Sequence, residues 1–261
     1  MKLALFGATG RMGLSITRLA HAAGDTIVGA SCGGNDPGLG RDLGDLAGVG
    51  TIGVATTADP MSALLGAEVV IDFTTAAAVP MLFAAAARQK IPIVSGTTGL
   101  DDAARRAVDR TAEAVPVLWS PNMSLGVQIL AELVEQAVSR LGPGYDVEIV
   151  EVHHKKKIDA PSGTAKRLAD AARAVRPELT ELSGRAGEVG ARKPDEMAVL
   201  SLRGGDVLGD HTVHLFGDGE RLELTHRATS RDVFAHGALR AARFLIGRAP
   251  GRYSIKDVLG A

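Results

Sequence analysis

The sequence predicts an α/β fold: a Rossmann-like parallel sheet in the N-terminal half, then a C-terminal α+β domain with a mixed or antiparallel sheet. Short apolar segments alternate with helical patterns over residues 1–124, as in parallel strands joined by right-handed crossovers. Beyond residue 195, strand-like segments follow one another through glycine-containing turns. The length of 261 residues suits one large domain or two modest ones.

The N-terminal half opens with a predicted strand, and a helical pattern follows in which Met12, Ile16 and Leu19 recur at helical spacing. The predicted strands of this half are Lys2–Phe6, Thr26–Ser31, Val69–Phe73, Ile91–Ser95 and Val115–Trp119. The predicted helices are Gly10–Ala23, an alanine-rich segment ending at Arg88, and Asp101–Ala114. Residues 33–50 are rich in glycine and lack periodicity, so we expect a mobile surface loop there.

The C-terminal half begins with a long helical pattern over Ser124–Leu141. The segments that follow are a strand at Asp146–Val152, a helix at Ala165–Val175, a polar irregular stretch at Leu179–Asp195, and strands at Ala198–Arg203, His211–Phe216 and Arg221–His226. The last helical pattern, Val233–Ile246, is expected to pack back on the first domain. We therefore expect one domain of residues 1–124 with 231–261 and a second of residues 125–230.

Composition excludes several classes of protein. The net charge of −1 and the 3% of aromatic residues argue against nucleic-acid binding, which needs a basic surface or stacking platforms. The N-terminus lacks the pattern of a signal peptide, and no apolar run approaches the roughly 18 residues of a membrane span. We expect a cytoplasmic protein with no membrane or nucleic-acid partner. The single cysteine, Cys32, excludes an internal disulfide and a cysteine-based zinc site, and is interpreted as a small buried hydrophobe.

Residues 7–13 form a glycine-rich turn between the first strand and the first helix. Gly7 permits a tight turn, Gly10 lets the backbone approach a pyrophosphate, and Gly13 allows close packing of helix on strand. The spacing is G-x-x-G-x-x-G rather than G-x-G-x-x-G, and an ordinary tight turn is the alternative. Its position between strand and helix favours a dinucleotide site.

The end of the second strand lacks the acidic residue that usually binds the adenosine ribose. Gly33 and Gly34 stand there, and Asp36 is the first candidate. Arg11 is placed to attract the extra phosphate of NADP, although a solvated arginine is an equal interpretation. The turns at 96–99 and 120–123 also follow parallel strands, so we expect them to border the same crevice.

The segment from Glu151 to Thr164 carries the densest chemical information. Two histidines and three consecutive lysines precede a Pro-Ser-Gly-Thr helix start, whose N–H groups suit a carboxylate. A solvated basic loop is the default interpretation of such a run. A small dianion over His154, Lys157 and the Ser162–Thr164 turn explains the pattern better. Further metal ligands at suitable spacing are missing nearby, so we expect no metal site.

These motifs closely resemble the dihydrodipicolinate reductase family, also called 4-hydroxy-tetrahydrodipicolinate reductase. The resemblance spans nearly the whole chain, and His-His-x-x-Lys-x-Asp-Ala-Pro-Ser-Gly-Thr is specific to that family. Further matching segments are Gly96–Gly99, Gly205–Thr212 and Thr225–Arg231. One departure is Gly33-Gly34, where many relatives carry an acidic residue, often followed by arginine. This departure leaves the ribose contacts to backbone groups or Asp36 and predicts a relaxed cofactor preference.

The resemblance implies hydride transfer from NADH or NADPH to a cyclic unsaturated imine dicarboxylate in the diaminopimelate/lysine pathway. It implies His153 as proton donor or acceptor and Lys157 as a second proton donor, with His154, Gly163 and Thr164 binding substrate. The implied cofactor-binding residues are Gly7, Ala8, Thr9, Gly10, Arg11, Met12, Gly96, Thr97, Thr98, Ser120, Pro121, Asn122 and Met123. The resemblance also implies a homotetramer assembled through the sheet of the second domain.

Other classes remain as alternatives. A nonenzymatic redox sensor would bind NADP without needing His153 or Lys157. An unrelated imine or amino-acid dehydrogenase would keep the fold but would not need the Ala160–Thr164 turn. A short-chain dehydrogenase needs Tyr-x-x-x-Lys, and neither Tyr145 nor Tyr253 is followed by lysine at that spacing.

Overall fold

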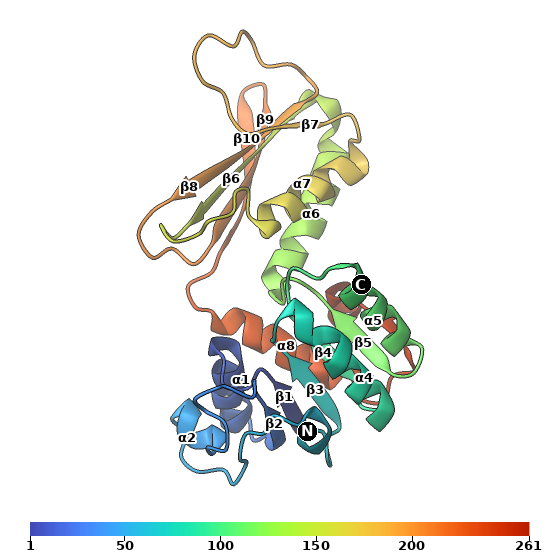
Figure 1. The fold of residues 1–261 in the computed structure, drawn as a ribbon. Coiled ribbons are helices and arrows are strands. Elements are labelled where there is room, and N and C mark those ends of the chain that lie inside the picture. The colour runs from blue at the N-terminus through green and yellow to red at the C-terminus, as the bar shows by residue number, and fades with distance from the viewer. Residues whose placement is uncertain (261) are drawn as a thin grey trace. The chain divides into compact units, whose positions relative to one another are not determined.

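A computed structural model describes residues 1–260 of the chain. Contacts divide the described chain into two compact units. The first unit contains Met1–Ser124 together with the segment from Asp232 onward, and the second contains Leu125–Arg231. Most helices and strands of the two units are labelled in Figure 1.

The first unit is built on a fully parallel sheet with strand order β11-β5-β4-β3-β1-β2 (Figure 1). The strands are β1 (Lys2–Phe6), β2 (Thr26–Ser31), β3 (Val69–Asp72), β4 (Ile93–Ser95), β5 (Pro116–Trp119) and β11 (Gly251–Tyr253). The helices are α1 (Arg11–Ala22), α2 (Leu43–Ala47), α3 (Pro60–Ala63), α4 (Val79–Gln89), α5 (Asp102–Ala112), α8 (Asp232–Leu245) and α9 (Ile255–Leu259). A 3-10 turn, Ala76–Ala78, precedes α4. The Rossmann-like parallel sheet predicted for the N-terminal half is confirmed.

The strands of this sheet are buried on both faces, which is why they read as nearly continuous apolar runs. Ala4 and Phe6 of β1 share a core cluster with side chains of α3, α4 and α5. Leu3 and Leu5 are equally buried and point the other way, since side chains alternate along a strand. Helices α1 and α8 pack against each other, and α8 also contacts β3 and β4. Helix α8 is therefore part of the first unit, although it follows the second unit in sequence.

The predicted mobile surface loop over residues 33–50 contains one regular element that was not predicted. Residues 43–47 form the short helix α2, and its N-cap is Asp42. The Asp42 carboxylate accepts hydrogen bonds from the backbone N–H groups of Gly44, Asp45, Ile52 and Val54. Five helical residues are too few to show a period, so the capping side chain was the only sequence signal. Strand β11 and helices α3 and α9 are also additions to the predicted elements.

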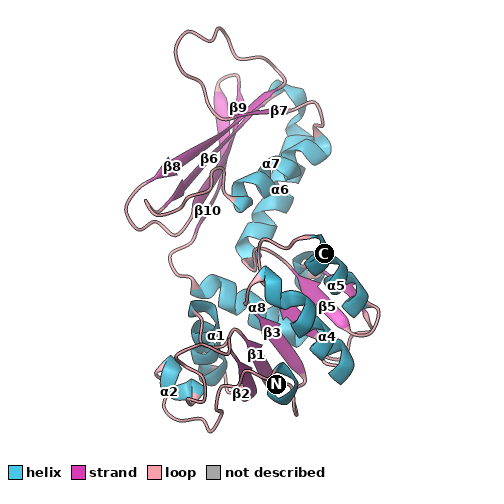
Figure 2. Ribbon diagram, viewed as in Figure 1, coloured by secondary structure: helices cyan, strands magenta, loops and turns pink. Residues whose placement is uncertain are grey.

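The second unit contains a mixed sheet with order β10-β9-β6-β8-β7 (Figure 2). Its strands are β6 (Asp146–His153), β7 (Thr180–Leu182), β8 (Glu196–Arg203), β9 (Asp210–Gly217) and β10 (Glu220–Arg227). Strand β9 runs antiparallel to β6 and β10, and β8 runs parallel to β6 and β7. The predicted mixed sheet is confirmed. Strand β7 lies inside the stretch that the sequence presented as irregular.

Helices α6 (Leu125–Leu141) and α7 (Gly163–Val175) cover one face of this mixed sheet. A 3-10 turn, Gly142–Gly144, follows α6. Val147 and Ile149 of β6 are fully buried against the two helices. Residues between them in the strand face the other side, where Leu202 is 54% and Phe216 38% exposed. The second unit therefore has one covered face and one open, partly apolar face.

Candidate functional site

The glycine-rich turn joins β1 to α1 with the geometry that its glycines require. Gly7 adopts a positive φ of 72°, and a Cβ placed on it would lie 2.6 Å from the Phe73 carbonyl oxygen. A Cβ on Gly13 would lie 2.3 Å from the Ala8 carbonyl oxygen, so only glycine lets α1 pack this closely on the turn. Gly10 is the N-cap of α1 and offers no side-chain hydrogen bond to the first helical turn.

This turn fits the pyrophosphate of a dinucleotide. The first N–H groups of a helix have no intrahelical partner, and the helix dipole favours an anion at this end. A serine or aspartate N-cap would occupy one of these N–H groups, whereas Gly10 leaves them to a ligand. Ala8 is fully buried and its N–H donates to the Ser31 carbonyl oxygen at 3.0 Å, so it shapes the turn, while Arg11 is exposed. Thr9 and Met12 are partly buried.

Asp36 lies at the glycine-rich turn rather than at the tip of β2. The Thr9 hydroxyl donates to its Oδ2 at 2.7 Å, and the Gly38 N–H donates to its Oδ1 at 2.8 Å. A Cβ on Gly33 or Gly34 would have no atom within 4 Å. The end of β2 is therefore open, and the nearby carboxylate is held by the turn itself. Cys32 is a half-buried free thiol rather than fully buried, and burial raises its pKa.

Asp72 organises the turns that follow β3 and β4, and the sequence analysis did not single it out. Its buried carboxylate accepts hydrogen bonds from the hydroxyls of Ser95 (2.6 Å), Thr97 (2.9 Å) and Thr74 (2.6 Å). Thr97 is 2% exposed, so its hydroxyl stabilises the turn by binding Asp72. A ligand would contact mainly the backbone of Gly96 and the exposed Thr98. A Cβ on Gly96 would collide with the Phe73 ring at 2.2 Å.

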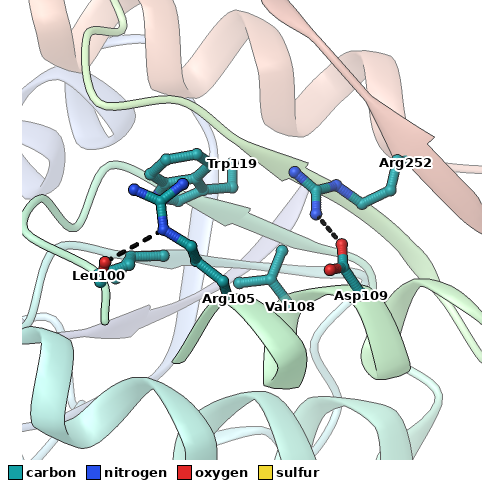
Figure 3. A pocket seen from close by; sticks show the side chains of 6 residues that line it. All are labelled: Leu100, Arg105, Val108, Asp109, Trp119 and Arg252. Carbon is teal, nitrogen blue, oxygen red and sulfur yellow. Dashed lines mark hydrogen bonds and ion pairs between the residues drawn. The ribbon is translucent and has the colours of Figure 1, made fainter. Parts of the chain in front are cut away.

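The Gly96–Thr98 turn is also held by Trp119 at the end of β5. The indole N–H of Trp119 donates to the Thr97 carbonyl oxygen at 2.8 Å. Behind it lies a pocket of about 130 Å³, shown in Figure 3, in which the Arg105 guanidinium stands over the Trp119 ring. The lining residues are Leu100, Arg105, Val108, Asp109, Trp119 and Arg252. None of these six is a predicted cofactor residue, and the contact of this group with the turn is the hydrogen bond from Trp119.

The Ser120–Met123 segment is a tight loop between β5 and α6. The Ser120 hydroxyl donates to the Asn122 carbonyl oxygen, and the Asn122 side chain accepts from the Ser124 N–H at 2.8 Å. Met123 is only 1% exposed, and Gly237 of α8 packs against its carbonyl group. Pro121 is exposed. The loop can therefore present backbone groups and Pro121 to a ligand, while the Met123 side chain belongs to the core.

The second unit concentrates its titratable groups around Glu151, near the end of β6. Glu151 is fully buried, and its Oε2 lies 2.5 Å from Nδ1 of His153. The Arg203 guanidinium donates to both carboxylate oxygens at 2.8 Å. Burial alone would raise the pKa of Glu151, but hydrogen bonds from Arg203, Ser201 and His153 outweigh it and lower the pKa to about 2. Glu151 is therefore a buried carboxylate.

His211 of β9 packs edge-on against His153, with ring centroids 5.1 Å apart. Its Nε2 lies 3.0 Å from the hydroxyl of Ser162, the N-cap of α7. Nδ1 of His211 is buried and has no hydrogen-bond partner in the described part of the chain. Burial, together with the charge of His153, lowers the pKa of His211 to about 4, so the ring is neutral near pH 7.

This burial predicts acid sensitivity. Unfolded His211 has a pKa near 6.5 and folded His211 one of about 4, so the unfolded state binds the extra proton first as pH falls. We expect the free energy of unfolding to fall by roughly 2–3 kcal/mol because of His211 as the pH is lowered from about 6.5 to 4. Urea unfolding of wild type and His211→Gln across this range measures the difference. Equal pH slopes for the two proteins would refute it.

Within the basic segment, Lys157 is bound by the carboxylate of Asp159, two residues further along the chain. Lys157 Nζ lies 2.7 and 2.9 Å from the two oxygens of Asp159, and this hydrogen bond lowers the pKa of Asp159. The Lys157 side chain is 19% exposed, whereas Lys155 and Lys156 are fully on the surface. Nδ1 of His154 is buried without a hydrogen-bond partner among residues 1–260.

The start of α7 follows this segment directly. The Ser162 hydroxyl accepts from the Ala165 N–H at 3.1 Å and so caps the helix. A Cβ on Gly163 would meet no atom within 4 Å, and Gly163 is exposed with no positive φ. The fold itself therefore does not require glycine there, whereas close approach of a ligand would. Thr164 is partly buried in the same first turn.

The predicted site residues fall into two groups. The cofactor candidates lie in the first unit, at the ends of β1, β4 and β5. His153, His154, Lys157, Gly163 and Thr164 lie in the second unit, between β6 and α7. Among the described residues, no cluster of three or more His, Cys, Asp or Glu side chains could hold a metal ion, and no helix is long and apolar enough to cross a membrane.

A Rossmann-like unit with a glycine-rich turn, followed by a unit with a buried histidine and a basic segment, is the arrangement of a nucleotide-dependent oxidoreductase. The family model "Dihydrodipicolinate reductase, N-terminus" matches residues 1–123, and the model of its C-terminus matches residues 126–259. The chain belongs to the dihydrodipicolinate reductase family.

Curated relatives agree with this family. The 4-hydroxy-tetrahydrodipicolinate reductase of Anaeromyxobacter dehalogenans is 49% identical, over 99% of this chain and 97% of its own. The enzyme of the same name from Myxococcus xanthus is 44% identical, over 100% and 98%. The solved dipicolinate-bound dihydrodipicolinate reductase from Paenisporosarcina sp. TG-14 has the same fold, with a TM-score of 0.78, 21% identity and coverage of 97% of each chain.

Proposed function

We propose that this chain reduces 4-hydroxy-tetrahydrodipicolinate, through dihydrodipicolinate, to tetrahydrodipicolinate in diaminopimelate and lysine biosynthesis, with NADH or NADPH as the hydride donor. The observation that carries the proposal is His153, whose Nδ1 is bound to a buried carboxylate beside the anion-binding start of α7. We place this biosynthetic reductase in the cytoplasm, where NADH and NADPH are available in their reduced forms.

The first unit, with the C-terminal segment, binds the nucleotide in this proposal. Bound NAD(P)H supplies the hydride, and the chain supplies orientation and charge. The N–H groups at the start of α1 hold the pyrophosphate. The backbones of Gly96, Thr98 and the Ser120–Met123 loop line the remainder of the crevice, at the carboxyl ends of β4 and β5.

The second unit binds the substrate in this proposal. Two carboxylates need cationic or N–H partners, and the first turn of α7 offers the N–H groups of Gly163 and Thr164. Lys157 and His154 supply the charge and the additional hydrogen-bonding group. The Paenisporosarcina reductase was solved with bound dipicolinate, a planar dicarboxylate, which supports this substrate class.

Reduction of a conjugated imine leaves an enamine anion that must take up a proton. His153 can deliver one from Nε2, since Nδ1 faces Glu151. Lys157 stands in the same segment, and its Nζ donates hydrogen bonds to both carboxylate oxygens of Asp159. We assign the single proton that balances the hydride, added at carbon, to His153, and we assign to Lys157 the charge that stabilises the anion before that proton arrives.

The nucleotide preference follows from the open end of β2. Arg11 is exposed at the start of α1 and can attract a 2′-phosphate, while Asp36 and backbone groups remain for a ribose hydroxyl. We propose that both nucleotides are used, with kcat/KM values within about tenfold of each other, since one such contact is worth about 1 kcal/mol.

The open face of the mixed sheet supports assembly into a homotetramer. Leu200 and Leu202 of β8 and Phe216 of β9 are exposed there, on the two strands that flank β6. An apolar sheet face of this kind is typical of an interaction surface. Light scattering should give a mass near four times 27.0 kDa, and a monomer would contradict the assembly.

The activity is tested in an assay in which a second enzyme, dihydrodipicolinate synthase, makes the substrate. Purified protein should oxidise NADH and NADPH only when the product of dihydrodipicolinate synthase is present, measured as loss of nicotinamide absorbance. Titrating the two nucleotides side by side gives the preference. Binding of NAD(P)H without any substrate-dependent oxidation would instead favour a redox sensor.

A further inference from the structure

Glu151 is the residue around which the proposed proton donor is organised. Its carboxylate lies on the helix-covered face of β6, two residues before His153 and on the same face. The Ser201 hydroxyl donates to Oε1 at 2.8 Å, the Ser162 N–H donates to Oε1 at 3.1 Å, and Arg203 donates to both oxygens. Every one of these neighbours is a donor, so the geometry suits a carboxylate and no other group of that size.

An ionised carboxylate can only accept hydrogen bonds. The 2.5 Å contact between Oε2 of Glu151 and Nδ1 of His153 therefore places the ring proton on Nδ1. In the neutral imidazole the lone pair then lies on Nε2, which can receive a proton and pass it on. No hydrogen bond joins Nε2 to another of the described residues. Gly209 lies beside it, and a Cβ on that glycine would lie 3.0 Å from Nε2.

We propose that Glu151 is the positioning residue of His153, and that Arg203 in turn holds Glu151 in place: the pair selects the Nδ1–H tautomer and aims Nε2 at the substrate. This inference rests on the proposed function, because it assigns His153 the proton transfer. Neither Glu151 nor Arg203 is expected to touch the substrate.

The same carboxylate links the histidine to the anion site. Its Oε1 holds the Ser162 N–H, and Arg203 also donates to the Asp159 carbonyl oxygen at 2.7 Å. The start of α7 and the loop carrying Lys157 are thereby fixed to the strand that carries His153. A shift of Glu151 would move proton donor and substrate carboxylate relative to each other, and displacements of that kind are costly in catalysis.

The decisive variant is Glu151→Gln. Glutamine keeps the size of the side chain but replaces one acceptor oxygen by an NH₂ group, which would face the hydrogen-bond donors that surround Glu151. We expect kcat to fall about 10²-fold, the upper part of the range for residues that orient a catalytic group, with KM changed less than about threefold. Ring-¹⁵N-labelled histidine should show the Nδ1–H tautomer for His153 in wild type and a mixture in the variant. The His153 signals are assigned by their loss in His153→Gln.

The matched control is Glu148→Gln. Glu148 lies on the same strand and its carboxylate is bound by Arg185, Arg192 and the Ala198 N–H, but it faces away from His153. Its loss should leave kcat and the histidine spectrum unchanged, with the oligomeric mass checked in parallel. If Glu151→Gln does not fold, Arg203→Lys serves as the second variant, and we expect about a tenfold lower kcat and a partial tautomer mixture.

Two results would overturn the positioning role. One is a wild-type spectrum with the His153 proton on Nε2, which is measured without any turnover. The other is a Glu151→Gln enzyme with kcat within about threefold of wild type. The proposed function fails separately, if wild type shows no substrate-dependent nucleotide oxidation while the tautomer is as expected.

Discussion

Replacing His153 by glutamine is expected to lower kcat by about 10²- to 10³-fold. Proton transfer by a positioned side chain contributes roughly 10²–10⁴-fold in enzymes, and glutamine offers no group that gains and loses a proton near neutral pH. The substitution keeps a polar side chain in the pocket beside Glu151 and His211, so the fold should survive. Steady-state kinetics with saturating nucleotide and substrate measure the loss.

Lys157→Gln is the companion variant, and we expect a fall in kcat of about 10²-fold together with a higher KM for the substrate. The higher KM follows from loss of a cation at the dianion site. His21→Gln serves as the control, because His21 is exposed in the last turn of α1 in the other unit. Wild-type turnover in both His153→Gln and Lys157→Gln would remove the roles assigned to them.

Gly13→Ala is expected to raise the KM for NADH and NADPH more than tenfold and to reduce stability by about 1–3 kcal/mol. The new methyl group would lie 2.3 Å from the Ala8 carbonyl oxygen and 2.5 Å from that of Gly7. Helix α1 must move away from the turn to relieve this contact, and the N–H groups that hold the pyrophosphate move with it. Nucleotide titration by fluorescence and thermal unfolding measure the two effects.

Gly144→Ala provides the control for this substitution. A Cβ on Gly144 meets no atom within 4 Å, and its φ is not in the left-handed region. It should leave both nucleotide affinity and thermal midpoint near their wild-type values. Unaltered nucleotide binding by Gly13→Ala would show that the close packing of α1 on the turn is not what positions the pyrophosphate.

The alternation of strands and helices in the first half was readable because parallel strands buried on both faces leave long apolar runs. Strand β2 was predicted to the residue at Thr26–Ser31. Short elements were not predicted. Helix α2 has five residues and β7 and β11 have three each, and such lengths show no hydrophobic period. Their existence depends on the neighbours that they cap or pair with.

Some residues of the candidate site could likewise be predicted from the sequence, and others could not. His153, Lys157 and the α7 start were singled out because chemically informative residues were adjacent in sequence. Asp72 was missed, since a lone aspartate at the end of an apolar strand looks like many others until three hydroxyls are seen around it. Glu151 could have been found from its spacing, because residues two apart in a strand share a face.

The sequence by itself determined the fold class, the glycine-rich turn after β1 and the family of this chain, since each depends on residues close together along the chain. Only the tertiary structure decided which groups surround His153. The strand register sets Arg203 beside His153, and it sets Ser201 and His211 on either side of Glu151. These partners come from strands about 50 residues away in sequence, and packing of the whole sheet against α6 and α7 selects that register.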